Sequence, residues 1–221
     1  MKLPIVILLL ANLLLVSSNA NAETVDTSSA AYKVAETVDF MVRAIRAMYT
    51  KQIISKLQSD SEDTLFDNVD NKRFTPLPAQ FIHDVDNYIK FYGQRSEVPP
   101  GFSFSLRSKW NLNEQRGLSD NFETEGWNAL EQQQLDALNS GIPYKDIEWK
   151  PYAEETIVDG KAILRYLSAD TATEKTCIDC HNRYENTDRA KSIRESEGVI
   201  SGKEFQLHEL MGALSIIVTL E

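Results

Sequence analysis

The sequence is poor in cysteine and histidine, with two cysteines and three histidines among 221 residues. The cysteines, Cys177 and Cys180, lie three positions apart, so a structural disulfide elsewhere in the chain is excluded. A structural zinc site takes four ligands, usually cysteine or histidine. Cys177, Cys180 and the adjacent His181 supply at most three crowded ligands, because His83 and His208 each stand alone in the sequence. A zinc site therefore remains an alternative, but it fits this composition poorly.

Long hydrophobic runs are also scarce, and the one that is present lies at the N-terminus. Residues 4–16 are apolar except for Asn12; Met1-Lys2 precedes them, and Ala20-Asn21-Ala22 offers a cleavage site. This pattern predicts a signal peptide over residues 1–22 and leaves residues 23–221 as one domain. The run is short for a membrane span, although an uncleaved anchor stays an alternative. No cysteine stands directly after this run, which argues against a lipoprotein, and no second hydrophobic span occurs. We therefore expect a periplasmic protein with no stable membrane span after processing.

The chain has fewer basic than acidic residues: 23 lysines and arginines against 33 aspartates and glutamates, which gives a formal net charge of −10. An acidic chain argues against nucleic acid and anionic membranes as partners. It is compatible with docking to a basic redox partner, and equally with simple solubility. The sequence shows no internal repeat, and we expect no kinase, cyclase or chemotaxis output domain after the single domain.

Against these absences, one motif carries recognisable chemistry: Cys177-Ile178-Asp179-Cys180-His181. Two thiols three positions apart with a histidine directly after them form the C-x-x-C-H signature of haem c attachment. Each thiol can add across one haem vinyl group, and His181 can bind the iron through a neutral ring nitrogen. A redox dithiol would sit at a strand-to-helix turn in a βαβ pattern, which we do not find. The motif favours one covalent haem c, with zinc and a redox dithiol as alternatives.

The hydrophobic pattern predicts helices first and antiparallel strands later, which indicates an α+β fold. Apolar residues at helical spacing in the first helix are Ala31, Val34, Val38, Met41, Ile45 and Met48. We expect helices over residues 30–57, from Thr75-Pro76-Leu77-Pro78 onward, and over residues 122–139. Strands are expected over residues 102–107 and 212–220, and a hairpin of residues 146–152 and 161–167 around Asp159-Gly160. Residues 60–73 are expected to form a loop, and residues 182–201 a loop with some helix.

The order of these pieces resembles the c-type haem, PAS-like periplasmic family, whose members occur as sensor domains of chemotaxis receptors, histidine kinases and cyclases and as free-standing exported proteins. The resemblance covers roughly residues 30–220. Besides the haem motif, its segments are Arg46-Ala47-Met48-Tyr49-Thr50-Lys51-Gln52-Ile53, Thr75-Pro76-Leu77-Pro78, Ser108-Lys109-Trp110-Asn111-Leu112-Asn113, Gly160-Lys161-Ala162-Ile163-Leu164-Arg165-Tyr166 and Met211-Gly212-Ala213-Leu214-Ser215-Ile216. Apart from the haem motif these segments are short, and their order gives them weight.

The resemblance implies a PAS-like antiparallel sheet with a long N-terminal helix, and one covalent haem with His181 as the proximal ligand. In relatives the sixth ligand is a methionine or cysteine of the long helix, or is water or absent. This chain has no spare cysteine. Met41 lies nearest to the position of the ligating methionine, and Met48 shares its helix face. For each methionine alone, a role in filling the core is the simpler explanation. His208 is a rival ligand, although its polar surroundings suit a histidine exposed to water.

Other residues are weaker candidates around the haem. Arg107 and Arg165 lie on expected strands and could pair with a haem propionate or be exposed to water. Trp110 and Tyr166 could line the haem cavity or belong to an ordinary core. His83 is expected on the outer part of its helix, and Met211 is expected to pack beside the last strand.

Two function classes fit these expectations. The first is a haem-based module that senses redox state or a small gas and acts through a protein partner. The second is a periplasmic electron-transfer cytochrome with a redox partner, for which a strong-field ligand such as Met41 would keep the iron low-spin. We find no positioned acid-base group for peroxidase-like catalysis, and we expect no enzymatic activity. Exchange of the long helix within a homodimer is compatible with the composition.

Overall fold

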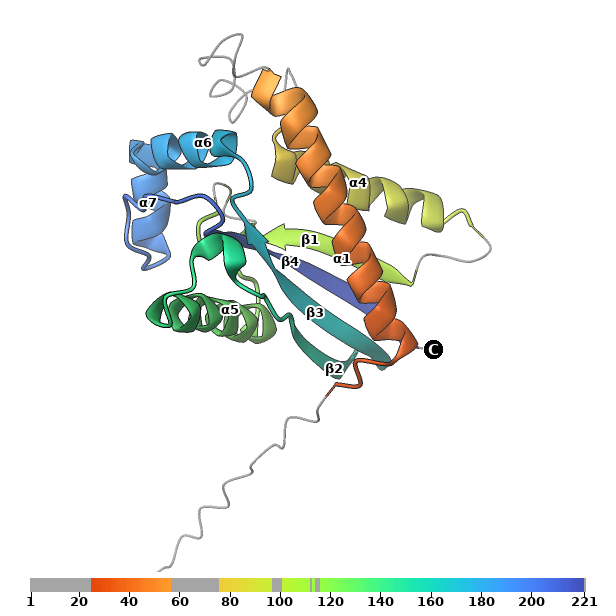
Figure 1. Ribbon diagram of the computed structural model, residues 1–221. Helices are drawn as coiled ribbons and strands as arrows, with labels where there is room; N and C mark the ends of the chain where they lie inside the picture. Colours follow the sequence, from red (N-terminus) through yellow and green to blue (C-terminus); the bar gives the residue numbers. More distant parts are fainter. Residues whose placement is uncertain (1–24, 57–75, 97–100, 112, 114–115, 221) are drawn as a thin grey trace, which may run out of the picture.

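The computed structural model describes residues 25–56, 76–96, 101–111, 113 and 116–220, and its described part has the expected α+β fold (Figure 1). The predicted signal peptide and the loop expected over 60–73 lie outside the described residues. The elements in chain order are α1 (Ala30–Tyr49), the π-helical turn η1 (Thr50–Ile54), α4 (Pro78–Gly93), β1 (Phe102–Arg107), α5 (Asn121–Asn139), the 3-10 turn η3 (Tyr144–Asp146), β2 (Tyr152–Val158), β3 (Lys161–Thr171), α6 (Lys175–Glu185), α7 (Asp188–Ser196) and β4 (Leu210–Thr219). None of the described helices is both long and apolar enough to cross a membrane.

Four antiparallel strands form one sheet in the order β1-β4-β3-β2, so the last strand of the chain lies in the middle. The predicted hairpin is present as β2 and β3, and its two-residue turn is Asp159-Gly160. Both turn residues have positive φ, 51° and 76°, as a type I′ hairpin turn requires. β3 continues beyond β2 to Thr171, and this extension leads directly to the helix that carries the cysteine motif.

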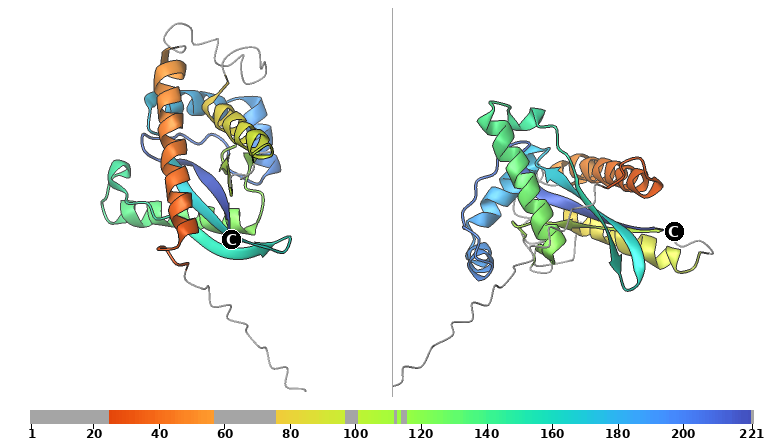
Figure 2. Two further views of the ribbon diagram at one scale, coloured as in Figure 1. Left: turned by 90° about the vertical axis from the view of Figure 1, so that its right-hand side faces the viewer. Right: turned by 90° about the horizontal axis from the view of Figure 1, so that it is seen from below.

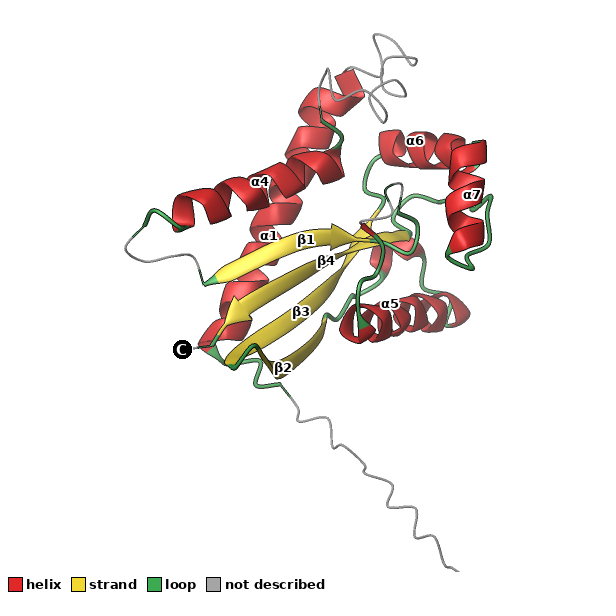
Figure 3. Cartoon of the chain, turned by 180° about the vertical axis from the view of Figure 1, so that it is seen from behind, coloured by secondary structure: helices red, strands yellow, loops and turns green. Residues whose placement is uncertain are grey.

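The helices divide between the two faces of the sheet. α1 and α4 share a core with one face, and α5 packs on the other; Figure 3 shows α1 passing behind the sheet, and Figure 2 gives two further views. The first core comprises Tyr32, Ala35, Val38, Val42, Ile82, Phe104, Leu164, Tyr166, Leu214, Ile216 and Val218. The second comprises Phe122, Trp127, Leu130, Leu167, Ala169, Leu210 and Ala213. Alternate residues of β3 and β4 thus serve opposite cores, which the period of two in a strand dictates.

The long first helix is present, but its buried face differs from the predicted one. The buried side chains of α1 are Tyr32, Ala35, Val38 and Val42. Met41 and Met48 of the predicted stripe are 54% and 56% exposed. A shift of one position rotates a helix by about 100°, because one turn takes 3.6 residues. The helix is therefore turned so that Arg46, rather than the methionines, continues the line of buried positions.

Two other expectations need correction. The first strand of the hairpin was expected over 146–152, but β2 begins only at Tyr152. Trp149 instead packs against the core between α5 and the sheet, so its apolar character does not mark a strand. The segment 182–201, expected mainly as loop, contains the end of α6 and all of α7, which Thr187 caps by accepting from the Ala190 amide.

Candidate haem-binding site

The cysteine motif lies on α6, directly after the end of β3. Cys177, Cys180 and His181 are spaced i, i+3 and i+4, so the helix places all three on one face. The helix begins without a side-chain cap, and Lys175 pairs with Asp179 across its first turn at 2.6 Å. The motif therefore presents two thiols and one imidazole to the same side of a short helix.

Both cysteines are free thiols and half-buried. Burial raises the pKa of Cys177 and raises that of Cys180 to about 11, with the neighbouring Cys177 adding to the effect on Cys180. Redox-active dithiols have a lowered pKa, because the thiolate is the reactive form. The environment of this pair is therefore unlike that of a thioredoxin-type site.

His181 carries the clearest sign of a missing bonding partner. Its Nδ1 atom is buried and has no hydrogen-bond partner among the described residues. Burial, with the charges of Arg46 and Arg194, lowers the pKa of His181 to about 4. The ring is thus neutral near neutral pH, and the neutral form is the one that binds a metal. A buried ring nitrogen without a partner is costly unless another group satisfies it, so His181 fits an iron ligand.

Apolar and aromatic side chains surround the motif. The His181 ring meets Phe205 edge-on, with centroids 5.7 Å apart and planes at 81°. Trp110 in turn contacts Phe205 at 5.8 Å and 90°. Asn182 fixes Phe205 through both its amide atoms, accepting from the Phe205 amide at 2.7 Å and donating to its carbonyl at 3.2 Å. Together with buried Met211, these side chains give an aromatic, water-poor wall suited to a porphyrin.

The C-terminal end of α1 reaches the same region. Arg46 forms an ion pair with Asp170 and donates to the Thr171 carbonyl at 3.2 Å, at the end of β3. The Ser55 and Thr176 hydroxyls lie 3.1 Å apart, which links η1 to the first turn of α6. Arg46 was not among the predicted site residues, although it opens one of the resemblance segments. The contacts join positions more than 120 residues apart, and no local pattern shows them.

A buried ion pair holds the far end of the motif helix. Arg194 of α7 pairs with Glu185 at 2.5 Å, and both side chains are fully buried. The guanidinium also donates to the Asn111 carbonyl at 2.7 Å, in the loop after β1. This arrangement ties α6, α7 and that loop together behind His181. Sequence reasoning missed this pair as well, because charged side chains rarely signal burial.

The structure does not bring the predicted methionine ligands to the motif. Met41 and Met48 lie on the exposed face of α1, roughly opposite to the face that carries Arg46 toward α6. Met211 is buried in the cluster with Phe205, as expected for a packing residue. His208 is half-buried with a left-handed backbone, φ 68°, and its amide donates to the Ala172 carbonyl at 2.7 Å. Of the candidates for the sixth ligand, His208 is therefore the one that lies beside a segment flanking the motif.

Several weaker candidates take up other roles. Arg107 pairs with Glu123 at 3.1 Å and Arg165 with Asp120 at 2.7 Å, so both strand arginines point to α5 and away from the motif. Tyr166 is buried in the core under α1 rather than beside His181. Trp110, a candidate for the wall of the haem cavity, contacts Phe205. The His83 ring lies 3.0 Å from the side-chain amide of Asn87 on the same helix. In the described part of the chain, no three histidine, cysteine or carboxylate residues cluster in a way that could hold a metal ion.

Comparison with known proteins agrees with this geometry. No curated protein and no solved structure matches the chain. The sequence model of the Tll0287-like family matches residues 18–219, nearly the whole chain. That family binds haem on a PAS-like fold. Its match takes in the sheet, the long helix and the cysteine motif together. This chain therefore belongs to the Tll0287-like family of haem-binding, PAS-like domains.

Proposed function

We propose that this protein is an exported monohaem c-type module that senses redox state or a small gas and passes the signal to a protein partner. Cys177 and Cys180 would hold the haem through two thioether bonds, and His181 would bind its iron. The module would work in the periplasm, and binding rather than catalysis would be its role.

Attachment through this motif needs no oxidant. Each Cys Sγ–H adds across one vinyl C=C bond, so that sulfur bonds to one carbon and the hydrogen ends on the other. The free state of both thiols supports this step, since a disulfide would block it. The bound group supplies an iron centre whose sixth position can take a ligand. The protein supplies the imidazole, the aromatic wall of Phe205 and Trp110, and the ion pair of Arg46 and Asp170 nearby.

The observation that favours sensing is the placement of Met41 and Met48 on the exposed face of α1. A methionine held by the long helix would give a closed, low-spin iron suited to electron transfer. With both thioethers turned to solvent, the chain offers no such ligand from this helix. This placement supports a weakly held or open sixth position that a small gas can occupy, with His208 as the rival ligand that remains near the motif.

The proposal is tested by absorption spectra of the purified holoprotein. The spectra are recorded for the oxidised protein, for the reduced protein, and for the reduced protein treated with carbon monoxide. We expect high-spin features and rapid carbon monoxide binding. Met41→Ala should leave all three spectra unchanged, because its side chain lies away from the motif. A low-spin iron that does not bind carbon monoxide, and that becomes high-spin in Met41→Ala, would contradict the proposal.

A periplasmic electron-transfer cytochrome is the second candidate, and the acidic charge of −10 favours it through docking to a basic partner. Such docking depends on salt, because exposed charges are screened within about 8 Å at physiological ionic strength. A low-spin spectrum together with electron exchange that slows steeply with added salt would select this function over sensing.

A further inference from the structure

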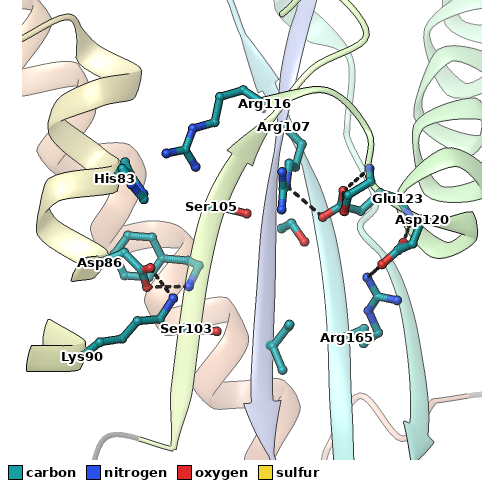
Figure 4. Close-up of a pocket in the computed structure, with 14 residues that line it drawn as sticks. His83, Asp86, Lys90, Ser103, Ser105, Arg107, Arg116, Asp120, Glu123 and Arg165 are labelled. Carbon is teal, nitrogen blue, oxygen red and sulfur yellow. Dashed lines mark hydrogen bonds and ion pairs between the residues drawn. The ribbon is translucent and has the colours of Figure 1, made fainter. Parts of the chain in front are cut away.

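A hollow lies away from the cysteine motif, on the side of the sheet where β1 forms the edge. Its volume is about 260 Å³, and it is bounded by α4, the strands β1, β4 and β3, and the start of α5 (Figure 4). None of the motif residues lines it. The lining is mostly polar and charged, whereas a porphyrin needs an apolar cavity. The hollow is therefore a separate feature with its own chemistry.

Strand register explains how the floor of this hollow becomes polar. Ser103 and Ser105 alternate with the core residues Phe102 and Phe104 along β1, so their hydroxyls lie on the α5 face. Ser215 pairs with Ser105 in the register and joins the same floor. Three hydroxyls thus cover the part of the sheet that α5 leaves open.

The side of the hollow next to α4 is fixed by a contact with the edge strand. Asp86 accepts from the Phe104 amide at 3.0 Å, which satisfies an outward-facing N–H of β1. Its carboxylate also pairs with Lys90 at 2.6 Å. His83 lies one turn before Asp86 on the same helix face, and its Nδ1 is buried without a hydrogen-bond partner.

The charges around the hollow do not balance. It is lined by four cationic side chains, Lys90, Arg107, Arg116 and Arg165, and by three anionic ones, Asp86, Asp120 and Glu123. The three carboxylates pair with Lys90, Arg107 and Arg165. The Arg116 guanidinium makes no ion pair or hydrogen bond with any described residue, and burial beside Arg107 lowers its pKa. Figure 4 shows it reaching across β1 toward His83.

A second donor, on β3 at the other side of the hollow (Figure 4), also lacks an acceptor. Arg165 Nε is buried and has no hydrogen-bond partner among the described residues, although the same side chain pairs with Asp120. The charges of Asp86 and Asp84 also act on Arg116, but neither carboxylate forms an ion pair with it. The one surplus positive charge among the lining residues, the unfilled guanidinium donor and the floor of hydroxyls together favour an anion with oxygen acceptors. A carboxylate, with a single negative charge, balances the surplus.

We propose that this hollow binds a small organic monocarboxylate, with Arg116 as the residue that recognises the carboxylate group. The volume is several times the ~30 Å³ that one water occupies in the liquid, so a short acid of a few carbons fits. The polar floor selects against long alkyl chains. The proposal goes beyond haem binding and does not depend on how the haem is attached.

Titration calorimetry on the holoprotein tests this site with acetate, glycolate and pyruvate, against the neutral isostere acetamide and inorganic phosphate. Sodium chloride keeps the ionic strength constant. We expect saturable binding of at least one carboxylate and none of acetamide. Arg116→Gln should weaken that binding about tenfold or more, since a hydrogen bond to a charged group is lost. Arg95→Gln removes an exposed arginine outside the hollow and should change nothing.

Ser105→Asp provides a second variant should Arg116→Gln fold poorly, as checked by circular dichroism. It places a carboxylate on the floor of the hollow and should abolish acid binding while the haem spectrum stays the same. Flat titrations with all three acids, equal binding of acetamide, binding of phosphate alone, or an Arg116→Gln variant with unchanged affinity would each overturn the proposal.

Discussion

The three reactive side chains of α6 make separate bonds in the proposed site, so they can be removed one at a time. Cys177→Ala and Cys180→Ala should each retain one thioether, and the double variant should retain none. Mass spectrometry under denaturing conditions measures this directly, after maturation in a host able to attach haem c. We expect a mass gain of one haem in the wild-type chain and in both single variants, and none in the double variant. A double variant that still carries haem after denaturation would exclude attachment through this motif.

The buried pair of Glu185 and Arg194 supports the motif helix from behind, and its loss should be costly. Glu185→Gln leaves the fully buried Arg194 guanidinium with only the more distant, partly exposed Glu197 carboxylate, 3.7 Å away, as a counter-charge. Breaking such a pair from one side typically destabilises a protein by about 3–5 kcal/mol. Urea unfolding should show a lower midpoint at an unchanged slope.

Glu36→Gln serves as the control for this loss, because it removes an exposed pair with Lys33. Exposed pairs of this kind contribute about 0.2–1 kcal/mol. Equal destabilisation by the two variants would mean that Arg194 is not buried as described.

At the scale of elements, α5 approaches the sheet closely at one glycine. A Cβ on Gly126 would lie 2.6 Å from Leu167 Cδ2 and 2.9 Å from Tyr152 Cδ1. Helix propensity alone predicts that Gly126→Ala stabilises the protein by roughly 1 kcal/mol. The clash should reverse this sign, because overpacking typically costs about 1–3 kcal/mol. Thermal unfolding decides between them: a raised midpoint would show that α5 sits farther from β2 and β3 than the structure indicates.

Element types were predictable from the sequence to a large extent, but the orientation of α1 was not. Periodicity identified α1, α4, α5, β1 and β4, since each carries a clear helical or alternating pattern. α1 carries apolar residues on two faces, with Val34 and Met41 on one and Ala35 and Val42 on the other. Local pattern could not choose between them. The choice is made by contacts with β3 and β4, which lie far away in the sequence.

The same distinction holds for the candidate site. Cys177, Cys180 and His181 were found from their spacing alone, because the chemistry of attachment requires it. Arg46, Phe205 and Arg194 were not, since each reaches the motif through tertiary contacts. Met41 was predicted as an iron ligand from its position along α1. A shift of one position rotates a side chain by about 100° around the helix axis, and this is enough to place Met41 on the exposed face.

Across the whole molecule, one loop joins the two proposed sites. It runs from β1 to α5, and Arg116 on it lines the hollow. Earlier in the same loop, Trp110 contacts Phe205, which meets the His181 ring, and the Asn111 carbonyl accepts from Arg194. The segment is therefore in contact with both the acid-binding hollow and the surroundings of His181. Binding at one site can change the free energy of the other through two states of such an element, or through the electric field of the bound charge.

Redox titration of the holoprotein, with and without a saturating carboxylate that binds the hollow, measures this coupling. We expect the added negative charge to favour the oxidised iron and to lower the midpoint potential by tens of millivolts. For a one-electron couple, a shift of about 59 mV corresponds to a tenfold difference between the affinities of the oxidised and reduced protein for the acid. By reciprocity, the oxidised protein should bind the acid more tightly by the same factor. Arg116→Gln should lose the shift, and chloride at equal ionic strength should not produce it. An acid that saturates the hollow without moving the potential would show that the loop holds the two sites apart rather than coupling them.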